Sequence, residues 1–203
     1  MSIQGLIIAA GESRRMDQWK LALPLGNKTI IQHTIENMYD YCETIILVGG
    51  HRLDQLKKLV AEYGKIKIVE NKQYQDGHHS SIKEGIRWIE GDTILYTPGD
   101  YPLIQHETYK ALVFHYSLNN YPMMAEYNRI PGPPLIIPKK KGLEFVSNKE
   151  NISLRDFLNK NSIQYIPVKD PGILKDIDTP VDYKNAQAYY HLHIGLYRNS
   201  VNS

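Results

Sequence analysis

Three separate stretches of the sequence carry residue types suited to holding a phosphate chain. The first is Ala9-Ala10-Gly11-Glu12-Ser13, whose small residues form a turn where backbone amides can approach an anion. The cations Arg14, Arg15 and Lys20 follow within ten positions. Small residues followed by cations favour a polyphosphate ligand, and the alternative is an ordinary strand-to-helix turn with surface cations.

The other two stretches supply carboxylates. Asp100 follows a predicted central strand, so its side chain would point into a ligand crevice at the strand end. Asp176 and Asp178 lie two positions apart, so in an extended segment they share one face and can converge on one cation. Magnesium bound to a nucleotide takes one or two protein carboxylates plus phosphate oxygens. The competing interpretation makes Asp178 a helix N-cap, but capping by Thr179 is compatible with a metal at Asp178.

Alternating strands and helices must bring these stretches together. Residues 3–10 are almost continuously apolar and break into the glycine turn, as in a strand buried on both faces. Helical spacing of apolar residues follows, and the alternation then repeats. The predicted strands are 3–10, 44–48, 66–70 and 93–97, and the predicted helices are 30–38, 53–63, 80–89 and 105–115. The carboxyl ends of such strands share one edge of the sheet.

The second half is less regular. It predicts strands at 123–127, 135–137 and 163–168, a proline-rich turn at 131–134, and helices at 153–160 and 180–190. We therefore expect an α/β fold: a doubly wound, mostly parallel Rossmann-like sheet with helices on both faces and a small inserted β flap in the C-terminal half.

Composition limits the classes of function. A chain of 203 residues favours one domain, which we place at residues 1–190, with a flexible tail at 191–203. The 24 basic and 22 acidic residues are mixed along the chain, so neither nucleic acid nor a membrane is an expected partner. No apolar run could span a bilayer, and no signal-peptide pattern is present. The single cysteine, Cys42, is consistent with a reducing compartment, and we interpret it as a small buried hydrophobic residue. These features predict a cytoplasmic protein.

Two common nucleotide fingerprints are missing. Neither G-x-G-x-x-G nor G-x-x-x-x-G-K-[ST] occurs, so a dinucleotide-binding oxidoreductase and a P-loop NTPase lose support. The adjacent histidines His78 and His79 would point apart, and we interpret them as part of a polar loop entering a helix capped by Ser80.

The order and content of these stretches resemble the MobA-like NTP transferases that attach CMP or GMP to molybdopterin, the molybdenum cofactor cytidylyltransferase and guanylyltransferase group. The resemblance covers residues 3–183. It is carried by LIIAAGESRRMDQWKLALPL at 6–25, GDYPLI at 99–104 and GILKDIDTPVDY at 172–183. Further matches are VGGHR at 48–52, Asn71, SSIKEGI at 80–86 and PGPPLII at 131–137.

The resemblance implies a magnesium-dependent transfer of a nucleoside monophosphate from an NTP to molybdopterin, with release of pyrophosphate. The loop from Ala9 to Ser13 would wrap the triphosphate, which Arg14 or Arg15 and Lys20 would neutralise. The implied catalytic residues are Lys20, Asp100 and Arg15. The implied metal ligands are Asp100, Asp178 and Asp176, and further implied nucleotide-binding residues are Asn71, Ser80 and Gly99.

The resemblance also bears on the choice of base. Cytidylyl-transferring members typically have alanine where this chain has Ala10, whereas guanylyl-transferring members have glycine. An added methyl group takes space that a purine would need, so the resemblance implies CTP as the nucleotide.

Two departures from the family pattern affect the acceptor side. Family members usually have glycine in place of Asp17, and Gly-His-Pro in place of Gly132-Pro133-Pro134. Because the second loop would face the acceptor, the acceptor could instead be a sugar phosphate or another small molecule. A second alternative is that the chain is a non-catalytic cofactor-maturation protein of the same fold. Transient contact with a molybdoenzyme is a further expected partnership.

Overall fold

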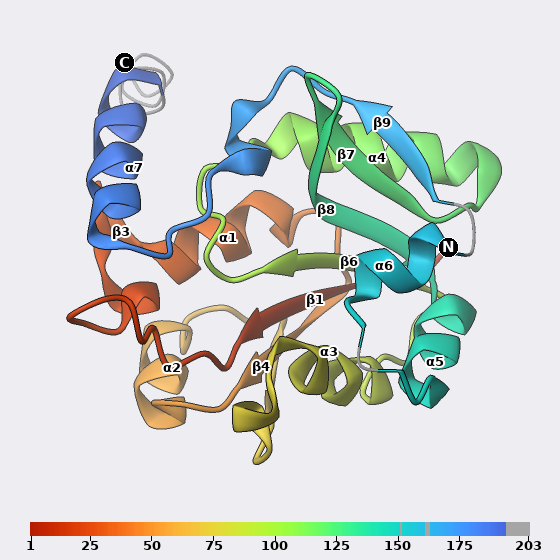
Figure 1. Ribbon diagram of the computed structural model, residues 1–203, viewed down its shortest axis with the longest axis horizontal. Coiled ribbons are helices and arrows are strands. Elements are labelled where there is room, and N and C mark those ends of the chain that lie inside the picture. Colours follow the sequence, from red (N-terminus) through yellow and green to blue (C-terminus); the bar gives the residue numbers. More distant parts are fainter. Residues whose placement is uncertain (151, 161–162, 194–203) are drawn as a thin grey trace.

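A seven-stranded sheet runs through the centre of the computed structural model, which describes residues 1–150, 152–160 and 163–193 (Figure 1). Its strand order is β5-β4-β1-β6-β8-β7-β9. Strand β8 is antiparallel to β6 and β7, and the other neighbouring pairs are parallel. The strands are β1 (Ile3–Ala9), β4 (Thr44–Gly49), β5 (Ile66–Glu70), β6 (Thr93–Pro98), β7 (Met123–Tyr127), β8 (Ile130–Pro138) and β9 (Gln164–Pro167). This sheet confirms the predicted mostly parallel α/β fold.

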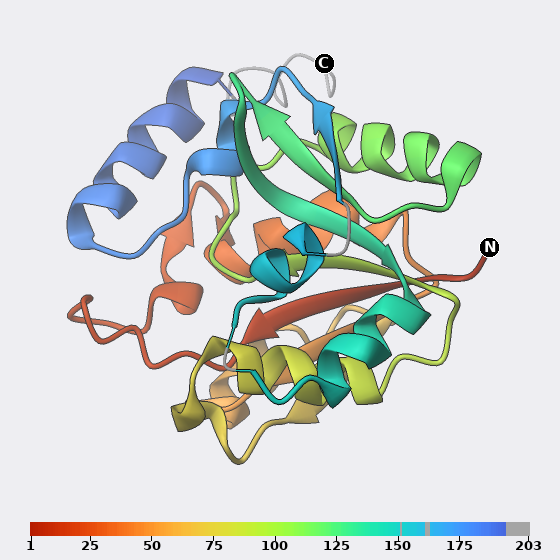
Figure 2. The ribbon, with the colours of Figure 1, turned by 45° about the vertical axis from the view of Figure 1, so that its right-hand side comes forward.

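Helices cover both faces of the sheet (Figure 2). Strand β1 explains why, because Ile7 and Leu6 point to opposite faces and belong to two different apolar clusters. One cluster includes residues of α1 (Ile30–Tyr39), α2 (Leu53–Leu59), α4 (His106–Asn119) and α7 (Pro180–His193). The other includes residues of α3 (His78–Arg87), α5 (Lys139–Ser147) and α6 (Leu154–Asn159). Both faces of the sheet are therefore buried, as predicted.

The proline-rich segment differs from its prediction. Residues 131–134 do not form a turn but lie inside β8, which pairs with β6 only from Leu135 onward. Before that point β8 pairs with β7 alone, so one of its edges carries no ladder hydrogen bond. Proline lacks an N–H group and is tolerated on such an edge. The chain instead reverses at Asn128 and Arg129, which both have positive φ angles, of 50° and 65°.

The additional C-terminal strands continue the central sheet beyond β6. A separate two-stranded sheet, which the sequence did not predict, consists of β2 (Pro24–Leu25) and β3 (Lys28–Thr29). Helix α7 packs beside it, and the hydroxyl of Tyr183 donates to the carbonyl oxygen of Pro24 over 2.5 Å. Helix α7 continues to His193 and so includes the first three residues of the segment that we expect to form a flexible tail. The rest of that tail lies outside the described residues.

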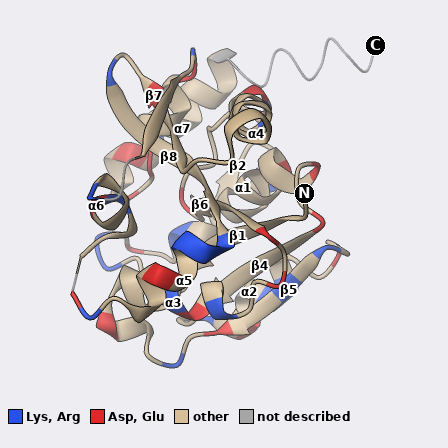
Figure 3. Cartoon of the chain, turned by 90° about the vertical axis from the view of Figure 1, so that its right-hand side faces the viewer, with Lys and Arg blue, Asp and Glu red and all other residues tan. Residues whose placement is uncertain are grey.

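Charge is spread over the molecule without a dominant sign. Figure 3 shows Lys and Arg interspersed with Asp and Glu along the ribbon, in line with a net charge of +2. No helix in the described part of the chain is both long enough and apolar enough to cross a bilayer.

Cys42 is 3% exposed, and burial raises the pKa of its thiol to about 12. This folded-state pKa exceeds the unfolded value of about 8.5, so the thiol of the native protein stays protonated at pH 8. Its contribution to the free energy of unfolding is fully present below about pH 8.5 and declines as the pH rises above that value. We expect no reaction with Ellman's reagent in the native protein at pH 8 and rapid reaction after denaturation. Equal rates in the two states would contradict this.

Candidate active site

A cavity of about 540 Å³ opens at the carboxyl-end edge of the parallel strands. The loop after β1 forms one side, and the segment between β5 and α3 forms another. Ligands of open α/β sheets bind at this edge because the connecting loops leave a crevice there. The lining residues include residues 8–15, Lys20, Leu21, Tyr74, Gln75, Gly77, His78, Ser81, Asp100 and Asp178.

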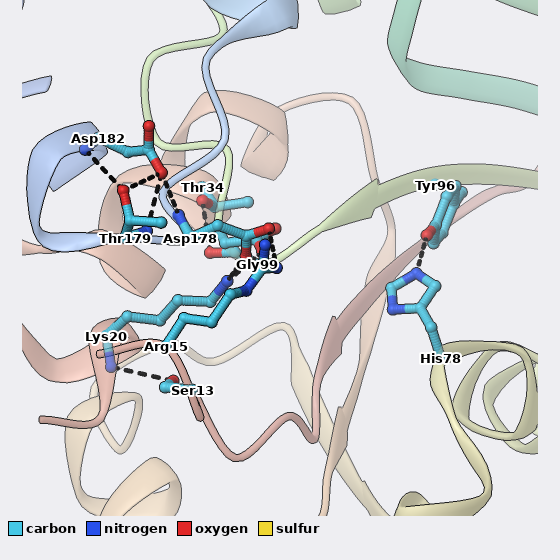
Figure 4. Close-up of polar contacts among 11 residues, drawn as sticks. Ser13, Arg15, Lys20, Thr34, His78, Tyr96, Gly99, Asp178, Thr179 and Asp182 are labelled. Carbon is cyan, nitrogen blue, oxygen red and sulfur yellow. Dashed lines mark hydrogen bonds and ion pairs between the residues drawn. The ribbon is translucent and has the colours of Figure 1, made fainter. Parts of the chain in front are cut away.

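The ammonium group of Lys20 lies between two carboxylates that are far apart in the sequence (Figure 4). Its Nζ donates to Oδ2 of Asp100 over 2.6 Å and to Oδ1 of Asp178 over 2.7 Å. The guanidinium of Arg15 donates to the other oxygen of Asp178. The three stretches that the sequence singled out therefore meet in one cavity.

Backbone contacts hold the three stretches in place. The N–H of Lys20 donates to Oγ of Ser13 over 3.2 Å, which closes the loop after β1. The N–H of Ile177 donates to the carbonyl oxygen of Asp100 over 3.1 Å, which ties the segment before α7 to the end of β6. The second contact holds the residue before Asp178 next to the backbone of Asp100.

A cap at the start of α7 orients Asp178. One carboxylate oxygen of Asp182 accepts from the N–H and the hydroxyl of Thr179, over 2.8 and 2.7 Å. The hydroxyl of Thr179 in turn accepts from the N–H of Asp182 over 3.2 Å. This reciprocal arrangement is a capping box, which fixes the direction of the chain as it enters a helix. Asp178 is thus held toward the cavity and does not serve as the cap.

Burial and charge set the protonation states of this cluster. Burial opposes the charged form of Lys20, but Asp100 and Asp178 outweigh it and raise the pKa of the ammonium group. Burial likewise opposes ionisation of Asp178, but Lys20 and Arg15 outweigh it and lower the pKa of that carboxyl group. At neutral pH Lys20 is therefore a cation and Asp178 an anion.

The donor set suits a hard divalent cation. Oδ1 of Asp100 is buried without a hydrogen-bond partner, and such an orphaned acceptor is suited to coordinating a metal ion. Asp178 offers a second carboxylate on the same cavity wall. No group of three His, Cys, Asp or Glu side chains in the described ranges could hold a metal by itself. An ion at Asp100 and Asp178 would complete its shell with phosphate oxygens and water, as magnesium does with nucleotides.

A family model described as the MobA-like NTP transferase domain matches residues 5–164. The chain belongs to this family. The molybdenum cofactor cytidylyltransferase of Escherichia coli K12 is 30% identical over 190 residues, which cover 93% of this chain and 97% of that protein. Both matches confirm the resemblance described for the sequence.

Solved structures agree on the fold of this MobA-like nucleotidyltransferase. A nucleotidyl transferase from Methanothermobacter superposes with a TM-score of 0.81 at 19% identity, covering 93% of this chain and 97% of that one. The Mycobacterium tuberculosis H37Rv protein Rv0371C, solved as a complex with manganese, gives a TM-score of 0.76 at 18% identity and covers 93% and 99%. At these identities the likeness concerns the fold.

The remaining sequence-predicted residues of the MobA-like site are distributed differently. Arg14 is mainly exposed and forms an ion pair with Glu12 within the loop after β1. Ala9 and Ala10 are buried and line the cavity. Asp176 does not line the cavity but borders a separate small hollow. Burial, together with the charges of Asp178 and Asp100, raises the pKa of Asp176, so this carboxyl group is near the pair without facing the ligand space.

Asn71, Ser80 and Gly99 lie behind the cavity wall. The side-chain amide of Asn71 donates to Oγ of Ser80 over 3.0 Å and to Oγ of Ser81 over 2.9 Å. Ser81, which the sequence analysis did not single out, is the member of this group that reaches the cavity. At Gly99 a Cβ atom would lie 2.9 Å from the carbonyl oxygen of Ile8, so only glycine lets the strand end pack this closely. These residues shape the wall.

Sequence reasoning also missed the segment that faces the glycine turn. Tyr74, Gln75, Gly77 and His78 line the cavity, from a short 3-10 turn and the first residue of α3. Polar residues of mixed type gave no motif there. The position of the segment directly after a parallel strand was the signal that could have found it.

A second cavity of about 390 Å³ is bordered by residues of β6, β7 and β8. Its lining is mainly apolar and comes from β8 and the turn before α7, with Arg155 as its charged residue among those described. Tyr101 borders this cavity, and its neighbour Asp100 borders the first one. Tyr96 also belongs to this lining. Consecutive residues at the end of β6 therefore border the two cavities.

We expect Lys20→Met to destabilise the metal-free protein, because Asp100 and Asp178 would lose the cation between them. Partial exposure of both carboxylates reduces the penalty of about 3–5 kcal/mol for a fully buried pair to roughly 1–3 kcal/mol. Urea unfolding in EDTA and in magnesium measures the effect, and magnesium should restore part of the lost stability.

Lys28→Met is the matched control, because Lys28 pairs with Glu36 outside the cavity. Its loss of stability should not respond to magnesium. Equal responses of the two variants to magnesium would show that Lys20 does not occupy a cation position.

Proposed function

We propose that this protein transfers CMP from CTP to molybdopterin and releases pyrophosphate, with Mg²⁺ held by Asp100 and Asp178. The observation that carries the proposal is the meeting of these carboxylates with Lys20 beside the glycine turn. The 30% identity to the Escherichia coli cytidylyltransferase over 93% of the chain supports the same choice of reaction. We also expect a cytoplasmic location and transient contact with a molybdoenzyme that takes the product.

The chemistry requires placement and charge neutralisation more than covalent help. A terminal phosphate oxygen of the acceptor attacks the α-phosphorus, a new P–O bond forms, and the bond to the pyrophosphate oxygen breaks with its electron pair. An ionised phosphate near pH 7 needs no general base. The protein would align the two substrates and stabilise the negative charge that accumulates on the phosphate oxygens.

Individual residues would take distinct parts in this transfer. The turn from Ala10 to Ser13 lines the cavity and would present its backbone amides to the phosphate chain. Bound Mg²⁺ would supply charge neutralisation at the phosphates. The ammonium of Lys20, which lies between the carboxylates of Asp100 and Asp178, would pair with phosphate oxygens of the nucleotide.

The second cavity suits a ring system carrying an anionic group. Tyr101 and Tyr96 offer aromatic surface, and Arg155 offers a cation that can pair with a phosphate. A sugar phosphate would meet few polar partners on the prolines of β8. The lining therefore favours a pterin phosphate over the sugar-phosphate acceptor that the sequence left open.

A pyrophosphate-release assay with CTP, GTP and ATP against molybdopterin and simple sugar phosphates tests this function. We expect turnover with CTP and molybdopterin. Ala10→Gly should narrow the preference for CTP over GTP by about tenfold, because one methyl group separates competing ligands by only ~1–3 kcal/mol. Turnover with a sugar phosphate but not with molybdopterin would show that the acceptor is a sugar phosphate. No turnover with any pair of substrates would favour a non-catalytic maturation protein.

Asp100→Asn should abolish magnesium-dependent turnover and leave the fold intact, because the neutral amide is a poor ligand for a hard cation. Circular dichroism checks the fold, and a magnesium titration of turnover measures the loss. Asp54→Asn is the control, since Asp54 lies exposed on α2 outside the cavity. A wild-type magnesium titration in Asp100→Asn would remove Asp100 from the metal site.

A further inference from the structure

We propose that His78 contacts the phosphate chain of the nucleotide, as a neutral Nδ1–H donor held in that tautomer by Tyr96. The sequence suggested a polar loop here, but α3 begins at His78 and places its ring on the cavity wall. The proposal extends the proposed function, because it takes the bound anion to be the nucleotide.

The bond between His78 and Tyr96 carries the inference. Nε2 of His78 lies 2.6 Å from the phenol oxygen of Tyr96, which belongs to β6 and is 7% exposed. Burial raises the pKa of this phenol well above its usual value, so the phenol keeps its proton. Within the described residues this is the one hydrogen bond recorded for the phenol.

Hydrogen-bond satisfaction then decides the tautomer. A buried phenol hydrogen left without an acceptor costs about 1–3 kcal/mol, so Tyr96 should donate and Nε2 should accept. The proton of the neutral ring then lies on Nδ1. A ring with one protonated nitrogen is neutral, so the donation from the Tyr96 phenol to Nε2 also fixes the charge of His78.

The second ring nitrogen of His78 is not used by the bond to Tyr96, and His78 lines the same cavity as Lys20 and Asp100. Figure 4 shows the pair of His78 and Tyr96 to one side of the cluster around Lys20, with the second nitrogen of the His78 ring pointing away from Tyr96. The charges of Asp100 and Lys20 both affect the pKa of the His78 ring, which Asp100 raises and Lys20 lowers. An N–H donor in this position can donate a hydrogen bond to an oxygen of the triphosphate with which Lys20 would also pair.

The pair spans the boundary between the two cavities. His78 lines the nucleotide cavity, and Tyr96 lines the cavity assigned to the acceptor. The phosphorus under attack must lie near this boundary, because the nucleophile comes from one cavity and the leaving group stays in the other. A donor held here would contact the phosphate that is transferred.

The opposite tautomer would give His78 a different role. With the proton on Nε2, the ring would donate to Tyr96 and present a lone pair on Nδ1 to the cavity, as a general base does. The buried phenol hydrogen would then lose its acceptor. The two tautomers have distinct ¹⁵N chemical shifts, so spectroscopy separates them.

The first test is long-range ¹H–¹⁵N spectroscopy of the histidine rings at pH 7.5, with His78→Asn to assign the signals. We expect His78 to show a protonated Nδ1 and an unprotonated Nε2, and its Nδ1 signal to shift when Mg·CTP is added. A protonated Nε2 would overturn the proposal, and so would a signal that saturating Mg·CTP leaves unmoved.

The second test is calorimetric titration of Mg·CTP into variants. His78→Leu should weaken affinity about tenfold or more, as expected for a lost hydrogen bond to a charged group. His78→Asn should stay within about threefold of wild type, because its amide places a donor near the position of Nδ1. His79→Leu is the matched control, since the neighbouring His79 does not line the cavity.

The outcomes separate this proposal from the proposed function. Equal affinity of wild type and His78→Leu for Mg·CTP would overturn the role of His78 and leave the nucleotide site standing. Equal weakening in His78→Leu and His78→Asn would show that the ring acts by shape and not as a donor, which also overturns the role. Failure of the wild-type protein to bind Mg·CTP would overturn the proposed function and this role together.

Discussion

The cation of Lys20 between the carboxylates of Asp100 and Asp178 is the contact on which the arrangement of the site depends. Two carboxylates brought together in a partly buried cavity repel each other unless a positive charge lies between them. Lys20 supplies that charge through its contacts with both carboxylates. Under the proposed function, Asp100 and Asp178 would hold a magnesium ion, which would supply positive charge at the same place.

The fold makes this contact possible because parallel strands end at a common edge. Asp100 follows β6, and Lys20 lies in the first segment after β1, so neighbouring strands deliver both residues to one crevice. Asp178 arrives from much later in the chain through the backbone bond between Ile177 and Asp100. Residues at the same strand end also border the second cavity, which the proposed function assigns to the acceptor.

The sequence predicted the parallel half of the sheet and the convergence of Lys20, Asp100 and Asp178, because these depend on hydrophobic period and on motif spacing. It did not predict the path of the prolines in β8, since tolerance of proline depends on which edge of the strand is paired. His78 was missed for a related reason. Its contact with Tyr96 depends on where α3 begins, and a shift of two residues changes a loop histidine into a cavity residue.

The most direct test of the central claim is a crystal structure with Mn²⁺ and a non-hydrolysable CTP analogue, in which anomalous scattering locates the metal. The account predicts an anomalous peak bound by carboxylate oxygens of Asp100 and Asp178 and by phosphate oxygens, with the ammonium of Lys20 moved from between the carboxylates onto the phosphates. A metal bound elsewhere, or a triphosphate that leaves the contacts of Lys20 with both carboxylates intact, would contradict it.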